Sequence, residues 1–171
     1  MSAPAWADGP IDGAVVRPLR RLEDGRGWLA EVFRDDEVEG GLRPAMAYVS
    51  VTRPGRARGP HEHRAQTDWF CFPGPGTFEV WLWDDRPGSP TRGRRLVVRA
   101  GRDEPRLVIV PPGVAHAYRN VSDEDGLVVN CPNALYMGPG RREPVDEIRH
   151  EDDPASPYRM DSFPQADGAT E

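Results

Sequence analysis

The stretch GRARGPHEHRAQTD, residues 55–68, contains the densest set of functional side chains in this sequence. His61 and His63 are one residue apart, and Gln66 and Asp68 follow. Successive side chains of a β-strand point to opposite faces, so two histidines at this spacing share one face of an extended segment. Burying such a polar face is costly unless its groups are paired or used. The stretch therefore indicates either metal ligands or catalytic bases.

A second histidine motif, PPGVAHAYRN, occupies residues 111–120 and contains His116. Two apolar runs, DWFCF and TFEVWLW, lie between the motifs and are joined by a PGPG loop. The two motifs in this order resemble the double motif of the cupins, with Asp68 standing where that motif has Glu. The resemblance implies a double-stranded β-helix, or jelly-roll barrel, in which His61, His63, Asp68 and His116 converge.

The rest of the chain reads as short strands separated by turns. Each stretch carries β-branched or aromatic residues and is bounded by Gly, Pro or Asp. Such dense turn signals favour an antiparallel sandwich or barrel over alternating strands and helices, so the predicted class is all-β. The further predicted strands lie in AVVRPLRRL, WLAEVF, AMAYVSVT, RRLVVRA, RLVIVPP and GLVVNCP.

The length of 171 residues suits a single domain with one core. We expect this domain to span residues 11–160. Residues 1–10 and the polar tail 161–171 are expected to be flexible. The aromatic residues of DWFCF and TFEVWLW are expected in the core or a dimer interface. The charged run DEIRHEDD, residues 146–153, is expected to be exposed, with His150 on the surface.

The composition excludes several classes of function. A formal net charge of −6 argues against nucleic acid or an anionic membrane as the main partner. All 22 basic residues are Arg, so Schiff-base chemistry and any role for Lys as acid, base or oxyanion stabiliser are impossible. Cys71 and Cys131 are expected to be buried free thiols in a reducing compartment. The chain lacks a signal-peptide pattern and any long apolar run, so we expect a cytoplasmic protein without membrane spans.

A second resemblance covers residues 11–158. The chain is similar to the dTDP-4-dehydrorhamnose 3,5-epimerase family in its segments RGPH, WDDRPGSPTRG and VPPGVAHAY. It also matches the family's N-terminal pattern at Asp24, Arg26, Gly27, Glu31, Phe33 and Arg34.

This resemblance implies a metal-free jelly-roll enzyme, usually a homodimer, that epimerises 4-keto-6-deoxy sugars carried on a nucleoside diphosphate. In that family a His removes the proton next to the ketone, a Lys stabilises the enolate, and a Tyr returns a proton from the other face. The resemblance makes His61 the base and Tyr136 the candidate acid. Candidate ligands of the nucleotide sugar are Arg26, Glu31, Arg58, Gln66 and His116.

When the sequences are aligned on Gln66, the family's Lys falls on Asp68. Because the Lys is missing, several mechanisms and functions remain possible. His61 and His63 could share acid and base roles without a metal, as in the similar sugar 3,4-ketoisomerases, with Asp68 orienting one ring. Alternatively, His61, His63, Asp68 and His116 could hold Zn, Fe, Ni or Mn, in a metal-assisted isomerase or a non-haem dioxygenase. A sugar-binding cupin without turnover is a third possibility.

Overall fold

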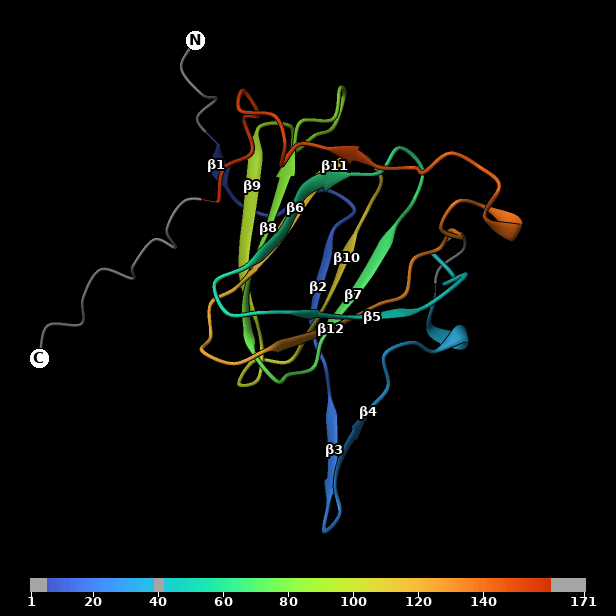
Figure 1. Ribbon diagram of the computed structural model, residues 1–171, viewed down its shortest axis with the longest axis vertical. Coiled ribbons are helices and arrows are strands. Elements are labelled where there is room, and N and C mark those ends of the chain that lie inside the picture. The colour runs from blue at the N-terminus through green and yellow to red at the C-terminus, as the bar shows by residue number, and fades with distance from the viewer. Residues whose placement is uncertain (1–5, 39–41, 161–171) are drawn as a thin grey trace, which may run out of the picture.

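The computed structural model describes residues 6–38 and 42–160, and it has two facing β-sheets (Figure 1). All strand pairs are antiparallel except β1 with β9. This arrangement confirms the predicted all-β jelly roll. Among the described residues, no helix has the length and apolar character needed to cross a membrane.

The six-stranded sheet has the order β1 (Ala7–Asp8), β9 (Arg94–Gly101), β8 (Thr77–Asp84), β11 (Val114–Asn120), β6 (Ala57–Glu62), β13 (Ile148–Arg149). The five-stranded sheet has the order β2 (Val15–Pro18), β10 (Arg106–Val110), β7 (Asp68–Phe72), β12 (Gly126–Asn130), β5 (Tyr48–Thr52). A separate hairpin of β3 (Arg21–Asp24) and β4 (Gly27–Ala30) projects away from both sheets (Figure 1). Two short 3₁₀ turns are η1 (Asp35–Glu37) and η2 (Pro139–Arg141).

Strands β7 and β8 are apolar on both faces because both faces are covered. Phe70 and Phe72 of β7 pack in the core between the sheets, whereas Trp69 and Cys71 pack outside it in a second cluster with Cys131. On β8, the inward side chains meet the same core, and Trp81 and Trp83 pack in a third cluster beneath the C-terminal segment. The predicted core role of these aromatic residues is thus confirmed, and both cysteines are buried and free.

The N-terminal boundary lies earlier than expected. Strand β1 pairs with β9, and the ring of Trp6 stacks on that of Tyr158 at 5.7 Å. Residues 6–10, expected to be flexible, therefore belong to the domain, because they cover the outer face of β8. The other residues expected to be flexible, 1–5 and 161–171, lie outside the described part of the chain.

The register of β6 against β11 places the first histidine motif beside the second. His61 pairs with His116, and a register shift follows between His116 and Tyr118. At this irregularity Gly59 has φ +80°, and a Cβ there would lie 2.5 Å from the carbonyl oxygen of His116. Only glycine fits so close an approach with this backbone conformation. Gly59 thus fixes where His61 enters the site.

Replacing Gly59 by Ala should lower the free energy of unfolding by about 2–4 kcal/mol, since it adds backbone strain and a clash with β11. Gly55 is the matched control, because its φ is +69° but no atom lies within 4 Å of its added Cβ. Gly55→Ala should cost only about 1–2 kcal/mol. Urea unfolding followed by tryptophan fluorescence measures both. Equal losses would show that the close approach to His116 is unimportant.

Candidate active site

The structure brings the three motif histidines together from different segments. His61 lies on β6, His63 follows the end of that strand, and His116 lies on β11. One ring nitrogen from each lies within 4.8 Å of the others. The ring centroids of His61 and His116 are 4.5 Å apart, and that of His63 is 5.7 and 5.9 Å from them. The predicted convergence of the two motifs is therefore present.

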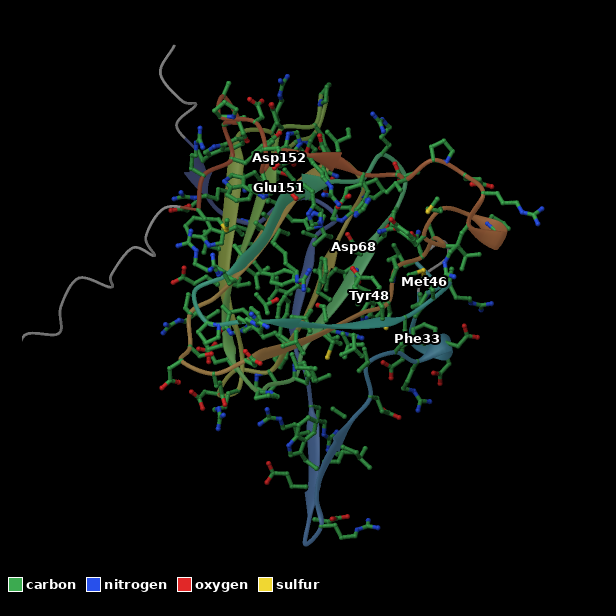
Figure 2. The ribbon with its side chains drawn as sticks, viewed as in Figure 1. Phe33, Met46, Tyr48, Asp68, Glu151 and Asp152 are labelled. Carbon is green, nitrogen blue, oxygen red and sulfur yellow. The ribbon has the colours of Figure 1, made fainter. Side chains whose placement is uncertain are left out.

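Asp68 approaches this cluster from the opposite sheet, at the start of β7. Figure 2 shows its side chain near the middle of the molecule, between the sheets. Its Oδ2 lies 3.1 Å from Nε2 of His63 and 3.2 Å from Nε2 of His116. Its Oδ1 accepts hydrogen bonds from the side-chain amides of Gln66 and Asn130, at 2.9 and 2.8 Å. All lone pairs of this buried carboxylate thus face polar groups.

The charge on Asp68 is stabilised inside the protein. Its side chain is only 2% exposed, and burial by itself raises the pKa of a carboxyl group. The close contacts with His116 and His63 outweigh burial and hold the pKa of Asp68 well below its usual range. A permanent negative charge therefore stands where the resembling family has a Lys.

His63 is held at both ring nitrogens. Nδ1 donates to the backbone carbonyl oxygen of Asp146, and Nε2 faces Asp68. Burial opposes a charged ring, but the hydrogen bond and charge of Asp68 raise the pKa of His63 above its ordinary value of 6.5. The arrangement is that of an imidazolium paired with a buried carboxylate.

His116 is also oriented by a backbone carbonyl, since its Nδ1 donates to the oxygen of Val114 at 3.0 Å. Its side chain is 4% exposed. Although Nε2 lies close to Asp68, that contact lacks hydrogen-bond geometry, so Nε2 has no hydrogen-bond partner among the described residues. His116 therefore places a buried ring nitrogen beside the carboxylate of Asp68.

His61 differs from His63 because its ring stays neutral. Burial and, next, the neighbouring His116 and His63 lower the pKa of His61 to about 3. Its Nδ1 lies 3.8 Å from Oε1 of Glu147, which is longer than a hydrogen bond. At neutral pH the ring can therefore accept a proton.

The segment around residue 146 completes the site, and sequence reasoning missed it. The carboxylate of Asp146 accepts hydrogen bonds from the backbone N–H groups of Arg64, Ala65 and Gln66, at 2.9–3.0 Å. Strand β13 pairs with β6, and His150 Nε2 lies 3.1 Å from Oε1 of Glu62. Residues 146–148 and His150 of this charged run are half-buried, so the prediction that His150 is a surface residue was wrong, whereas Arg149 and residues 151–153 are exposed as expected. Nothing in its composition signalled that it would add a strand beside His61.

A cavity of about 1260 Å³ opens above the cluster. His61 and His63 line it, whereas Asp68 and His116 lie beneath them. The predicted acid Tyr136 also lines the cavity and is 54% exposed. Other residues of the wall are Arg58, Gln66, Met46, Tyr48, Ser50 and Tyr118.

Two further tyrosines reach this cavity that the sequence did not single out. The hydroxyl of Tyr118 lies 3.3 Å from Oγ of Ser50, and that of Tyr48 accepts from the amide of Asn130 at 3.0 Å. Burial raises the pKa of Tyr48 to about 12 and raises that of Tyr118 too. Both hydroxyls therefore stay protonated and are available as hydrogen-bond donors.

Two predicted ligands of the nucleotide sugar lie elsewhere. Arg26 lies in the turn at the tip of the projecting hairpin and pairs with Asp24, at 2.6 Å. Glu31 follows β4 and pairs with Arg34. Neither Arg26 nor Glu31 is among the described residues that line the cavity. Arg58, by contrast, lines it.

Comparison with known proteins agrees with this geometry. The family model for dTDP-4-dehydrorhamnose 3,5-epimerase matches residues 8–152. A protein of Haloferax volcanii named probable low-salt glycan biosynthesis epimerase Agl13 is 37% identical over 127 residues, which cover 74% of this chain and 81% of that protein. The Bacillus subtilis spore coat polysaccharide biosynthesis protein SpsL is 40% identical over 128 residues, covering 74% and 82%. The crystal structure of a dTDP sugar isomerase from Desulfovibrio desulfuricans has a TM-score of 0.74 at 30% identity, covering 87% of this chain and 91% of that one.

The fold and the site thus define a jelly-roll enzyme of the isomerase class. The chain belongs to the dTDP-4-dehydrorhamnose 3,5-epimerase family. Membership confirms the family predicted from the sequence and the predicted activity class, that of a nucleotide-sugar epimerase.

Replacing Asp68 by Asn should lower the pKa of His63, because burial then acts on the ring with only the smaller contribution of Asp146 opposing it. NMR titration of the histidine ring protons measures this. In the wild type, protonated His63 stabilises the fold below pH 6.5, and this contribution is lost as the pH rises through its raised pKa. The control is Glu62→Gln, which removes the partner of His150 and should leave His63 unchanged. An unaltered His63 titration in Asp68→Asn would contradict the pairing.

Proposed function

We propose that this protein epimerises a 4-keto-6-deoxy sugar carried on dTDP, and that His61 is the base that removes the proton next to the ketone. The observation that supports it most is a neutral imidazole at the floor of a large cavity, with an available lone pair, in a chain of this family. The curated relatives take part in glycan and spore coat polysaccharide biosynthesis, according to their names. Such pathways use activated sugars of this chemical class.

The proposed reaction moves one proton at a time. Nitrogen of His61 accepts the proton from the carbon beside the ketone, and the electron pair of the broken C–H bond forms an enolate on the C4 oxygen. Tyr136 then donates its phenolic proton to the opposite face of the same carbon, and the configuration is inverted. Protonated His61 then loses its proton to solvent, and deprotonated Tyr136 regains one from solvent. A general base placed in this way contributes about 10²- to 10⁴-fold to the rate.

Asp68 no longer conflicts with this chemistry once the charge of His63 is considered. A lone carboxylate beside a developing enolate would repel it. The paired imidazolium of His63 lies 3.1 Å from Asp68 and offsets that charge, so the pair adds no net negative charge to the floor of the cavity. On this proposal the reaction needs no cofactor. The cytoplasmic location expected from the sequence stays a prediction.

The geometry favours epimerisation by His61 over a shuttle shared by His61 and His63. Both ring nitrogens of His63 are engaged, one with the carbonyl of Asp146 and one with Asp68. A ring held in this way has no lone pair to offer a substrate.

Replacing His61 by Asn should lower deuterium incorporation beside the ketone of a dTDP-4-keto-6-deoxyhexose in deuterated water by about 10²- to 10⁴-fold, because the variant lacks the base. Mass spectrometry of the recovered sugar measures it. The matched control is His150→Asn, which changes the histidine outside the cluster and should leave the rate within about twofold of wild type. Undiminished exchange in His61→Asn would refute His61 as the base.

A homodimer is the second part of the proposal. The projecting hairpin exposes Trp28 by 46% and Leu29 by 57%, on opposite sides of the strand β4. Val49 and Val51 of β5, at the edge of the five-stranded sheet, are also exposed. Exposed apolar side chains and an open sheet edge are typical of an interface between copies. In such a dimer, the hairpin of one subunit would bring its Arg26 to the cavity of the other subunit, since Arg26 does not line the cavity of its own chain.

Trp28→Asp should convert this dimer to a monomer, because it places a charge in the interface. Light scattering coupled to gel filtration measures the mass. Val121→Asp is the control, since Val121 is partly exposed in the turn after β11 and should leave the dimer intact. A wild-type monomer, or an unchanged dimer in Trp28→Asp, would argue against the hairpin as the interface.

A further inference from the structure

We propose that the hydroxyl of Tyr48 binds the enolate oxygen that forms when a proton is removed beside the ketone, and that it serves where this chain has no Lys. The inference rests on the proposed function, in which His61 is the base. An enolate forms readily only where a donor already points at the oxygen that gains the negative charge. Because all 22 basic residues are Arg, no ammonium group can be that donor.

Tyr48 begins β5 and lines the same cavity as His61. Figure 2 shows Tyr48 and Asp68 in the same part of the molecule. Asn130 joins these two side chains, because its Nδ2 donates to the Tyr48 hydroxyl at 3.0 Å and to Oδ1 of Asp68 at 2.8 Å. The hydroxyl therefore lies one amide group away from the carboxylate that stands in place of the family's Lys.

The hydrogen bond from Asn130 decides how the hydroxyl of Tyr48 can be used. Oδ1 of Asn130 accepts from the backbone N–H of Trp69 at 2.9 Å, which fixes the orientation of the amide, so Nδ2 is the atom that faces Tyr48. A phenol oxygen that accepts from an amide still has its own proton to donate. No acceptor for that proton lies within hydrogen-bond distance among the described residues. The proton is therefore left for a ligand in the cavity.

The donor is held in place and keeps its proton. Asn130 is only 1% exposed and makes hydrogen bonds to three different residues, so it fixes the position of the Tyr48 oxygen. The ring of Tyr48 is 43% exposed and lines the cavity, whereas burial of its hydroxyl raises the pKa of Tyr48 to about 12. A phenol with this pKa donates a hydrogen bond at neutral pH without becoming charged.

Other donors at the floor of the cavity are already engaged. Nε2 of His63 and the side-chain amide of Gln66 both face the carboxylate of Asp68, at 3.1 and 2.9 Å. The hydroxyl of Tyr118 shares a hydrogen bond with a serine Oγ at 3.3 Å. Tyr48 differs from these three side chains because its proton has no acceptor. It is the donor that can bind a new negative charge without losing an existing contact.

The proposed step moves one proton and leaves that of Tyr48 in place. The C–H bond beside the ketone breaks, and its proton passes to His61. Its electron pair forms a C=C bond while the π electrons of the ketone move to the C4 oxygen. Tyr48 donates a hydrogen bond to that oxygen and keeps its proton. When Tyr136 protonates the carbon from the other face, the C=O bond forms again and the hydrogen bond weakens.

Tyr48→Phe tests the donor, because it removes the hydroxyl and keeps the ring. Deuterium exchange into a dTDP-4-keto-6-deoxyhexose and inversion of its configuration should both fall about 10²- to 10³-fold in kcat. KM and the Kd of dTDP, measured by calorimetry, should stay within about twofold, because the bond strengthens only as charge develops. The matched control is Tyr158→Phe, whose ring stacks on Trp6 outside the cavity and which should keep both rates within about twofold. Circular dichroism checks that both variants fold.

The comparison of exchange with inversion separates this role from that of a proton donor. In Tyr136→Phe, His61 can still remove a proton and return deuterium on its own face, so exchange should persist while inversion is lost. The same pattern in Tyr48→Phe would overturn the proposal, because Tyr48 would then be the acid. Undiminished turnover in Tyr48→Phe, or a raised KM with unchanged kcat, would also overturn it and leave His61 standing as the base. Absence of exchange in the wild type would instead refute the proposed function, and this role of Tyr48 with it.

Discussion

The buried contact between Asp68 and two imidazoles joins the two sheets of the jelly roll. Asp68 begins β7 in one sheet, and His116 lies on β11 in the other. A charge buried to this degree destabilises a fold unless it is paired and hydrogen-bonded. Here the contacts with His63 and His116, together with two amide donors, meet that requirement. The packing of the two sheets at this point therefore depends on the charges of Asp68 and its histidine partners.

Because of the same contact, three residues of one type, all histidines, have different electrostatic environments and different roles. His63 faces Asp68 through a hydrogen bond and takes the positive charge. Burial and, next, the neighbouring imidazoles lower the pKa of His61 to about 3, and the carboxylate of Glu147 is too distant for a hydrogen bond that would offset them. His116 is oriented by a backbone carbonyl and keeps a buried Nε2 without a hydrogen-bond partner among the described residues. One carboxylate in place of a Lys thus changes how the whole cluster is charged, while the base at position 61 is preserved.

Much of this arrangement was predictable because it depends on local spacing. The alternation of a strand places His61 and His63 on one face, and the order of the two motifs identified the fold. The charged run 146–153 could not be placed in the same way. Its alternation is weak, and it becomes part of the site only because β13 pairs with β6 and Asp146 caps the backbone of residues 64–66. The hairpin could not be placed from the motif either: Arg26 matches the family pattern, but it lies outside the cavity of its own chain, so its role as a ligand stays a prediction.

The sequence by itself determined the all-β class, the family, and the identity of the four groups that meet in the site, because these follow from residue types at short, regular spacings. The tertiary structure alone decided which histidine is charged, which is neutral, and which segment closes the cavity. Those properties depend on burial and on distances of a few ångströms between residues far apart in the chain. Coulomb interactions and desolvation vary steeply over such distances, and no pattern along the sequence encodes them.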